Sequence, residues 1–82
     1  MSDHNNYIFE KIEDELEDAE NYYKNADLHE SRGEKEVAAT LLSIGSEEIT
    51  HAITLMDLLP HGVKLPHELD EKMHNVLEMY DL

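Results

Sequence analysis

Glu48 and His51, within the stretch SEEITHAI (residues 46–53), form a Glu-x-x-His pair in a segment that is otherwise rich in apolar residues. Residues three apart lie on the same side of a helix, so the carboxylate and the imidazole would point the same way. Glu15 supplies a second carboxylate, in a position between Ile12 and Ala19 where the pattern calls for an apolar residue. Carboxylates and imidazoles bind divalent transition metals, so Glu15, Glu48 and His51 are candidate metal ligands.

Three segments must position these residues. Apolar residues recur every three or four positions in each segment, which predicts helices over about residues 5–30, 34–59 and 66–80. Gly33 suits the turn after the first helix, Pro60 and Gly62 suit the end of the second, and Pro66 suits the start of the third. With no strand pattern or repeat in the sequence, we expect one all-α domain over residues 1–82. Its architecture would be an antiparallel two-helix hairpin plus a short third helix.

The hairpin would bring the two glutamates together. If the chain turns near residues 31–33, Glu15 and Glu48 lie at equal height on neighbouring helices, with His51 one turn away. Both glutamates fall on the apolar stripes that would form the helix interface, and no Lys or Arg lies on either stripe. A buried carboxylate without a partner is costly or takes up a proton, and a metal ion would resolve that conflict. The alternative is that the three side chains reach solvent at the edge of a helix.

One chain supplies half of a known ligand set. Di-iron carboxylate bundles take a Glu from each of two helices and a Glu-x-x-His motif from each of the other two. This chain has one of each, so a symmetric antiparallel dimer of hairpins would complete both the site and a four-helix bundle. The dimer would also cover apolar surface that a chain of 82 residues is too short to bury by itself.

The composition limits the possible partners. The chain has 20 Asp and Glu against 6 Lys and Arg, with a formal net charge of −14. Nucleic acid and anionic membranes are therefore not expected partners, because both are bound through Lys and Arg. The acidic strip Glu10, Glu13, Asp14, Glu17 and Asp18 either attracts cations towards the site or is simply a solvated face.

Several further classes are excluded by the residues that are missing. The sequence has no cysteine, which rules out disulfides, zinc ribbons, iron–sulfur sites and thiol catalysis. No apolar run has the length of a bilayer span, and the N-terminus MSDHNNY lacks the pattern of a signal peptide. A cytoplasmic location is therefore expected.

The stretches ELEDAENYY (15–23) and GEKEVAATLLSIGSEEITHA (33–52) resemble the first helical pair of rubrerythrin-type members of the ferritin-like superfamily. The resemblance covers roughly residues 8–59. It implies that Glu15, Glu48 and His51 are iron ligands and that Tyr22 donates a hydrogen bond to a ligating carboxylate.

The chain departs from that superfamily in having one helical pair where a full ferritin-like chain has two. It therefore also resembles encapsulated ferritins, whose iron site forms between subunits that assemble as rings of dimers inside an encapsulin shell. This resemblance implies a homodimer or a higher, ring-like homo-oligomer, with an encapsulin shell as partner. The C-terminal shell-docking tail of those proteins is not apparent in HNVLEMYDL (74–82).

The function implied by the resemblance is that of a ferroxidase, which oxidises Fe²⁺ with O₂ or H₂O₂ at a di-iron site shared by two subunits, for iron storage or detoxification. One alternative is a rubrerythrin-like enzyme that scavenges peroxide, which without a cysteine-rich rubredoxin domain would need an external electron donor. Another is a non-catalytic helical module that assembles around metal. Mn²⁺ and Zn²⁺ suit similar ligands, so the native metal stays open. The remaining histidines, among them His61, His67 and His74, lie on no ligand-like stripe.

Overall fold

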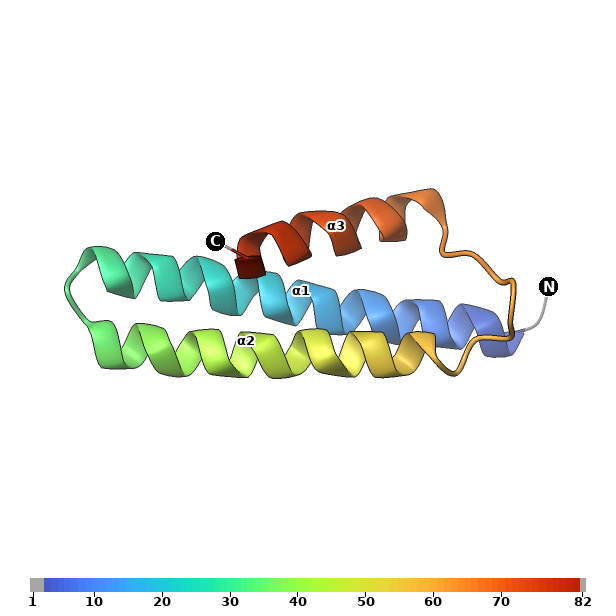
Figure 1. Ribbon diagram of the computed structural model, residues 1–82, viewed down its shortest axis with the longest axis horizontal. Coiled ribbons are helices and arrows are strands. Elements are labelled where there is room, and N and C mark those ends of the chain that lie inside the picture. Colours follow the sequence, from blue (N-terminus) through green and yellow to red (C-terminus); the bar gives the residue numbers. More distant parts are fainter. Residues whose placement is uncertain (1–2, 82) are drawn as a thin grey trace.

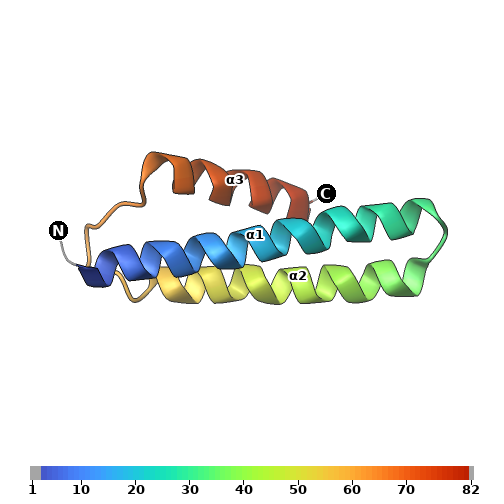
Figure 2. The same cartoon turned by 180° about the vertical axis from the view of Figure 1, so that it is seen from behind.

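The computed structural model describes residues 3–81, which form three α-helices: α1 (Asp3–Ser31), α2 (Lys35–Met56) and α3 (His67–Asp81). α1 and α2 run antiparallel and side by side, and α3 folds back along the N-terminal part of α1 (Figure 1). The view from behind shows the same order, with α1 between the other two helices (Figure 2). The predicted all-α hairpin with a short third helix is confirmed.

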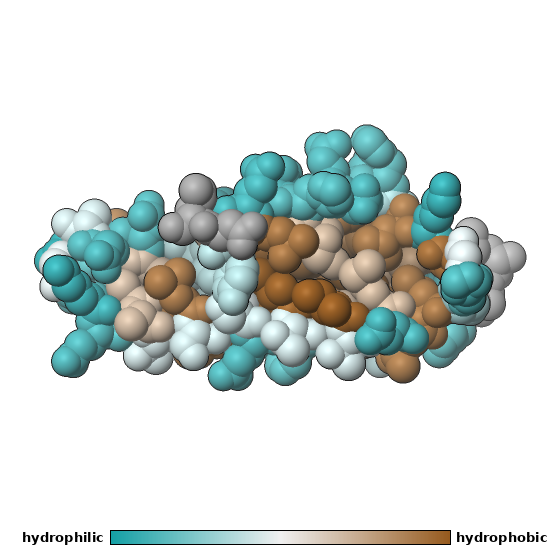
Figure 3. All heavy atoms as spheres, viewed as in Figure 1, coloured by the Kyte–Doolittle hydropathy of each residue, from teal (hydrophilic) through white to brown (hydrophobic). Residues whose placement is uncertain are grey.

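The core forms along α1 because its apolar residues recur at helical spacing and both other helices pack against them. Ile12 and Leu16 are completely buried at its centre. The space-filling view shows an apolar band along the middle of the molecule, between the hydrophilic outer surface of α3 and the edge formed by α2 (Figure 3). The other buried apolar residues are Ile8, Ala19, Tyr23 and Ala26 of α1, Ala38, Ile49 and Ala52 of α2, and Leu69, Met73 and Val76 of α3.

The ends of α2 lie close to the predicted positions but do not coincide with them. Its last α-helical residue is Met56, three residues before the predicted end. The amides of Asp57, Leu58 and Leu59 instead bond carbonyls three residues earlier, at 3.1, 3.0 and 3.1 Å. This tighter final turn fits the approach to Pro60, which disfavours α-helical geometry in the residue before it. None of the helices found in residues 3–81 combines the length and apolarity needed to cross a membrane.

The turn between α1 and α2 depends on Gly33, whose φ is +79°. We expect Gly33→Ala to lower the free energy of unfolding by about 1 kcal/mol, because a side chain at positive φ strains the backbone. An added Cβ would meet nothing within 4 Å, so the cost comes from the backbone alone. Urea denaturation measures it, and Gly33→Asn should cost less because Asn tolerates this conformation. Equal losses in the two variants would contradict the explanation.

Candidate metal centre

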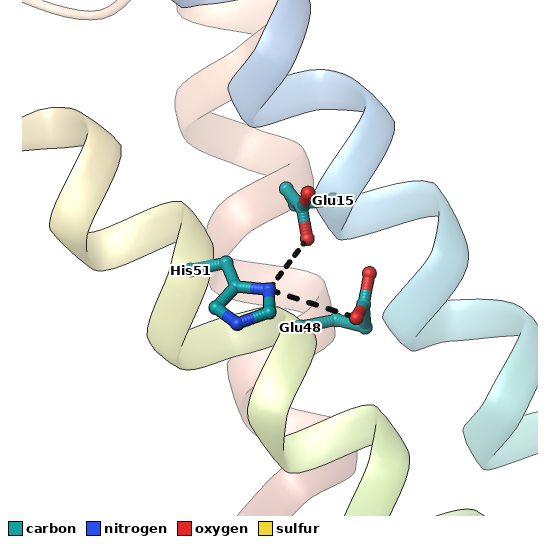
Figure 4. A group of neighbouring side chains, drawn as sticks. All are labelled: Glu15, Glu48 and His51. Carbon is teal, nitrogen blue, oxygen red and sulfur yellow. Dashed lines mark hydrogen bonds and ion pairs between the residues drawn. The ribbon is translucent and has the colours of Figure 1, made fainter.

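Glu15, Glu48 and His51 converge on one point between α1 and α2. Each offers a ligand atom, and these atoms all lie within 4.8 Å of one another. Figure 4 shows Glu15 extending from α1 towards Glu48 and His51 of α2, while the α3 ribbon passes behind both helices. The sequence-based prediction that the two glutamates meet at equal height is therefore confirmed. The equal height follows because the rise per residue is the same in both helices and a short turn joins them.

The three side chains lie at the edge of the helix interface and not inside it. The exposed fractions of the side chains are 26% for Glu15, 18% for Glu48 and 56% for His51. The buried line of α2 runs through Gly45, Ile49 and Ala52, and Glu48 borders that line. The expected inward placement is thus correct in part for the glutamates and wrong for His51, which the structure leaves accessible to solvent or to another chain.

The imidazole of His51 bridges the two carboxylates. Its Nδ1 lies 3.3 Å from Glu15 Oε2 and 3.7 Å from Glu48 Oε1, and both interactions are drawn in Figure 4. Within residues 3–81, no Lys or Arg forms an ion pair with Glu15 or Glu48. The negative charge of the pair is therefore balanced only by His51, and only while that ring is protonated.

The pKa of Glu48 is raised from 4.5 to about 7. The main cause is burial, which disfavours the charged carboxylate, followed by a hydrogen bond and charge repulsion with Glu15. The charge of Asp18 raises the pKa of Glu48 further, whereas His51 lowers it. Two carboxylates that repel each other at a half-buried position need a proton or a cation between them, which is the electrostatic condition that a metal ion meets.

The donor set suits a divalent transition metal. Two carboxylates carry a charge of −2, which balances one M²⁺ ion, and the neutral imidazole adds a nitrogen ligand. Three protein ligands leave further coordination positions for water or for groups from a second chain. Because His51 is exposed and the cluster is open on one side, both sources have access.

Tyr22 lies on α1, two turns beyond Glu15. It is half-buried and lines a hollow of about 270 Å³ together with Asp18, Asn21, Asn25 and Leu41. Within the described part of the chain Tyr22 makes no hydrogen bond to Glu15 or Glu48, so its expected role as a donor stays a prediction.

Asp18 belongs to the acidic strip for which the sequence leaves two readings open, attraction of cations towards the site or a solvated face. It lines the same hollow as Tyr22 and acts electrostatically on Glu48. The signal was present in its spacing, because Asp18 follows Glu15 by three residues and therefore lies on the same side of α1. A third carboxylate thus adds to the negative potential at the cluster.

Among the residues that the structure describes, the other histidines form no comparable group. His67 and His74 each pair with one carboxylate on the exposed surface of α3, Glu71 at 3.3 Å and Asp70 at 3.6 Å. Glu15, Glu48 and His51 are the only metal-ligand group of three or more side chains found within residues 3–81. Comparison of the chain with protein families, with curated proteins and with solved structures finds no match.

Proposed function

We propose that this protein binds Fe²⁺ through Glu15, Glu48 and His51 and oxidises it, at a site completed by the same residues of a second copy. The observation that carries this proposal is the convergence of two half-buried carboxylates and an imidazole, with no ion pair from a Lys or Arg among the described residues. Such a group is costly in the metal-free protein and favourable around a cation.

The surface around the ligands suits a second copy. Apolar residues flank Glu48 along α2 and the turn that follows it. Leu41, Ile44 and Leu55 are half-buried, Val37 is 44% exposed, and Leu58, just beyond the end of α2, is 57% exposed. α3 does not cover this side, because it passes behind the two helices that carry the ligands (Figure 4). An exposed apolar stripe of this kind marks a contact surface.

The stripe is also close to symmetric about Glu48. Leu41 and Leu55 each stand seven residues from Glu48, on opposite sides of it along α2. A two-fold axis beside Glu48 would therefore place Leu41 of each copy against Leu55 of the other, and would bring the two ligand clusters together. The pair of copies would contribute four carboxylates and two imidazoles, which match two divalent ions in charge.

The roles of the side chains follow from their chemistry. Glu15 and Glu48 hold Fe²⁺ as anionic oxygen ligands, and His51 holds it as a neutral nitrogen ligand. Leu41 and Leu55 exclude water from the shared site once two copies meet. Two Fe²⁺ ions, the substrate, each lose one electron, and the pair of electrons with two protons reduces one O₂ to H₂O₂.

Anaerobic titration with Fe²⁺ tests the proposal. We expect saturation near one iron per chain, and after admission of air a ferric absorption in the near-ultraviolet that rises faster than in buffer. His51→Ala should weaken iron binding by more than the roughly 10- to 100-fold typical of losing an outer-shell partner, because a direct ligand is lost. His74→Ala on the exposed surface of α3 is the matched control and should bind as the unaltered protein does.

The outcomes separate this proposal from its rivals. Absence of stoichiometric binding, or equal binding by the His51→Ala protein, would overturn the site. Metal-dependent association without oxidation would identify an assembly module. Turnover of peroxide that depends on an added reductant would identify a peroxide-reducing enzyme at the same residues.

A further inference from the structure

α1 and α2 approach each other closely at Gly45. A Cβ built on this residue would lie 2.7 Å from Cε1 and 3.0 Å from Cδ1 of Tyr23, and 3.3 Å from Cβ of Tyr22. Carbon atoms in contact normally stay at about 3.5–4.0 Å, so a side chain at this position has no room. The α1–α2 spacing therefore depends on the absence of a side chain at Gly45.

The atoms that Gly45 faces are not free to move away. Tyr23 is 4% exposed, its hydroxyl lies 3.5 Å from Ser46 Oγ, and its ring centroid lies 6.2 Å from that of Tyr80 on α3. The Tyr22 atom is a Cβ, which is fixed to the backbone of α1. An added methyl group at Gly45 would accordingly displace the backbone of α1 relative to α2, at least locally.

This contact lies within one turn of Glu48 on α2 and two turns from Glu15 on α1. Gly45 precedes Glu48 by three residues, about 4.5 Å along the axis of α2. Tyr22 follows Glu15 by seven residues, or two turns of α1, so a shift at Tyr22 is carried to Glu15 by a rigid helix. Glu15 and His51 come from different helices, and their 3.3 Å separation depends on the interhelical spacing.

We propose that Gly45 is a positioning residue for the metal centre, which sets the α1–α2 spacing at which Glu15 reaches the ligand atoms of Glu48 and His51. It acts through Tyr22 and Tyr23 and does not touch the metal. The inference rests on the proposed metal site and adds a specific determinant of its geometry. Its competitor is that Gly45 serves packing and stability alone.

Co²⁺ binding distinguishes the two, because the visible absorption of Co²⁺ reports coordination geometry as well as affinity. We expect Gly45→Ala to weaken Co²⁺ binding by about 10- to 100-fold, the range for residues that orient a ligand, and to change the visible spectrum. Gly33→Ala is the matched control: the same substitution strains the turn, where a Cβ has open space, and should leave both Co²⁺ affinity and spectrum unchanged.

A second comparison, made in a Tyr23→Leu background, does not require the Gly45→Ala single variant to fold. Tyr23→Leu removes the ring atom that lies nearest to the added Cβ. With Leu at position 23, adding Gly45→Ala should change Co²⁺ affinity by less than about threefold, because the main steric conflict is gone.

Four outcomes of the Co²⁺ experiments would contradict the proposed role of Gly45. Unaltered affinity and spectrum in Gly45→Ala, or an equal loss in Gly33→Ala, would reduce Gly45 to a packing residue while leaving the metal site intact. A loss of affinity that persists unchanged in the Tyr23→Leu background would exclude the contact as its cause. Failure of the unaltered protein to bind Co²⁺ would overturn both the metal site and this inference.

Discussion

Glu48→Gln is expected to make the metal-free protein more stable at pH 8 while it abolishes metal binding. Burial and the neighbouring Glu15 raise the pKa of Glu48 from 4.5 to about 7, so ionisation of Glu48 is less favourable in the folded chain than in the unfolded one. Gln has a similar shape and no charge to bury. Gain of stability with loss of binding is the signature of a residue retained for its ligand chemistry.

The sign of the pH dependence follows from linkage. Between pH 4.5 and about 7 the folded state holds more of the Glu48 proton than the unfolded state does, so stability falls as the pH rises through this window. The full shift corresponds to roughly 3 kcal/mol at about 1.4 kcal/mol per pH unit, and partial exposure reduces this to about 2 kcal/mol. The stability difference between Glu48→Gln and the unaltered protein should grow over this range and level off above it.

Chemical denaturation with a chelator present, from pH 4.5 to 8, measures this difference. Glu47→Gln is the matched control, because Glu47 is the preceding residue of the same helix and its side chain is exposed. It should change neither the slope with pH nor the affinity for Fe²⁺ or Co²⁺. A Glu48→Gln protein that is no more stable at pH 8 than at pH 4.5, relative to the unaltered chain, would contradict the electrostatic account of the cluster.

Replacing Val37 and Leu58 together by Glu is expected to separate the two copies of the metal-loaded protein. Both residues are exposed, at 44% and 57%, so the chain should fold without them. In the proposed dimer Val37 of each copy lies near Leu58 of the other, because they stand eleven and ten residues from Glu48 on opposite sides. Four introduced carboxylates would then meet in pairs, and like charges at an interface cost several kcal/mol.

The expected effect is a rise of more than about 100-fold in the dimer dissociation constant. Sedimentation or light scattering, with and without Co²⁺, measures it, and the Co²⁺ titration should weaken in parallel. The double variant with Glu in place of Leu42 and Ile53 of α2 is the control, because these residues are similarly exposed, at 47% and 48%. Leu42 lines a hollow with Tyr23 of α1 and Met79 of α3, on another side of α2. A dimer that survives the first double variant, or dissociates equally in both, would rule out the proposed surface.

The sequence by itself determined the helices and the meeting of the ligands. Periodic apolar residues and the turn at Gly33 are local features, and they are enough to define a hairpin. Because the rise per residue of a helix is fixed, the numbers of Glu15 and Glu48 then determine that the two side chains face each other. The helices, and the position of each residue along their axes, can thus be predicted without any knowledge of tertiary packing.

Rotation of the helices about their axes was decided only by the tertiary structure. An apolar stripe is about 100° wide or more, and its pattern does not say which part of it faces the neighbouring helix. The side of α2 that carries the small residues Gly45 and Ala52 packs against α1, because small residues permit a close approach. Glu48 therefore lies at the edge of the interface and His51 is exposed. Periodicity treats all apolar positions alike, whereas packing depends on their sizes.

Local sequence patterns likewise did not predict on which side of the hairpin α3 packs. The segment with Pro60 and Gly62 ends α2 but does not say which side of the hairpin the chain returns to. Packing of Leu69, Met73 and Val76 against α1, with an ion pair of 3.1 Å between Lys72 and Glu17, puts α3 behind the helices that carry the ligands. These contacts join residues more than fifty positions apart, so only the folded chain reveals that the ligand side stays uncovered.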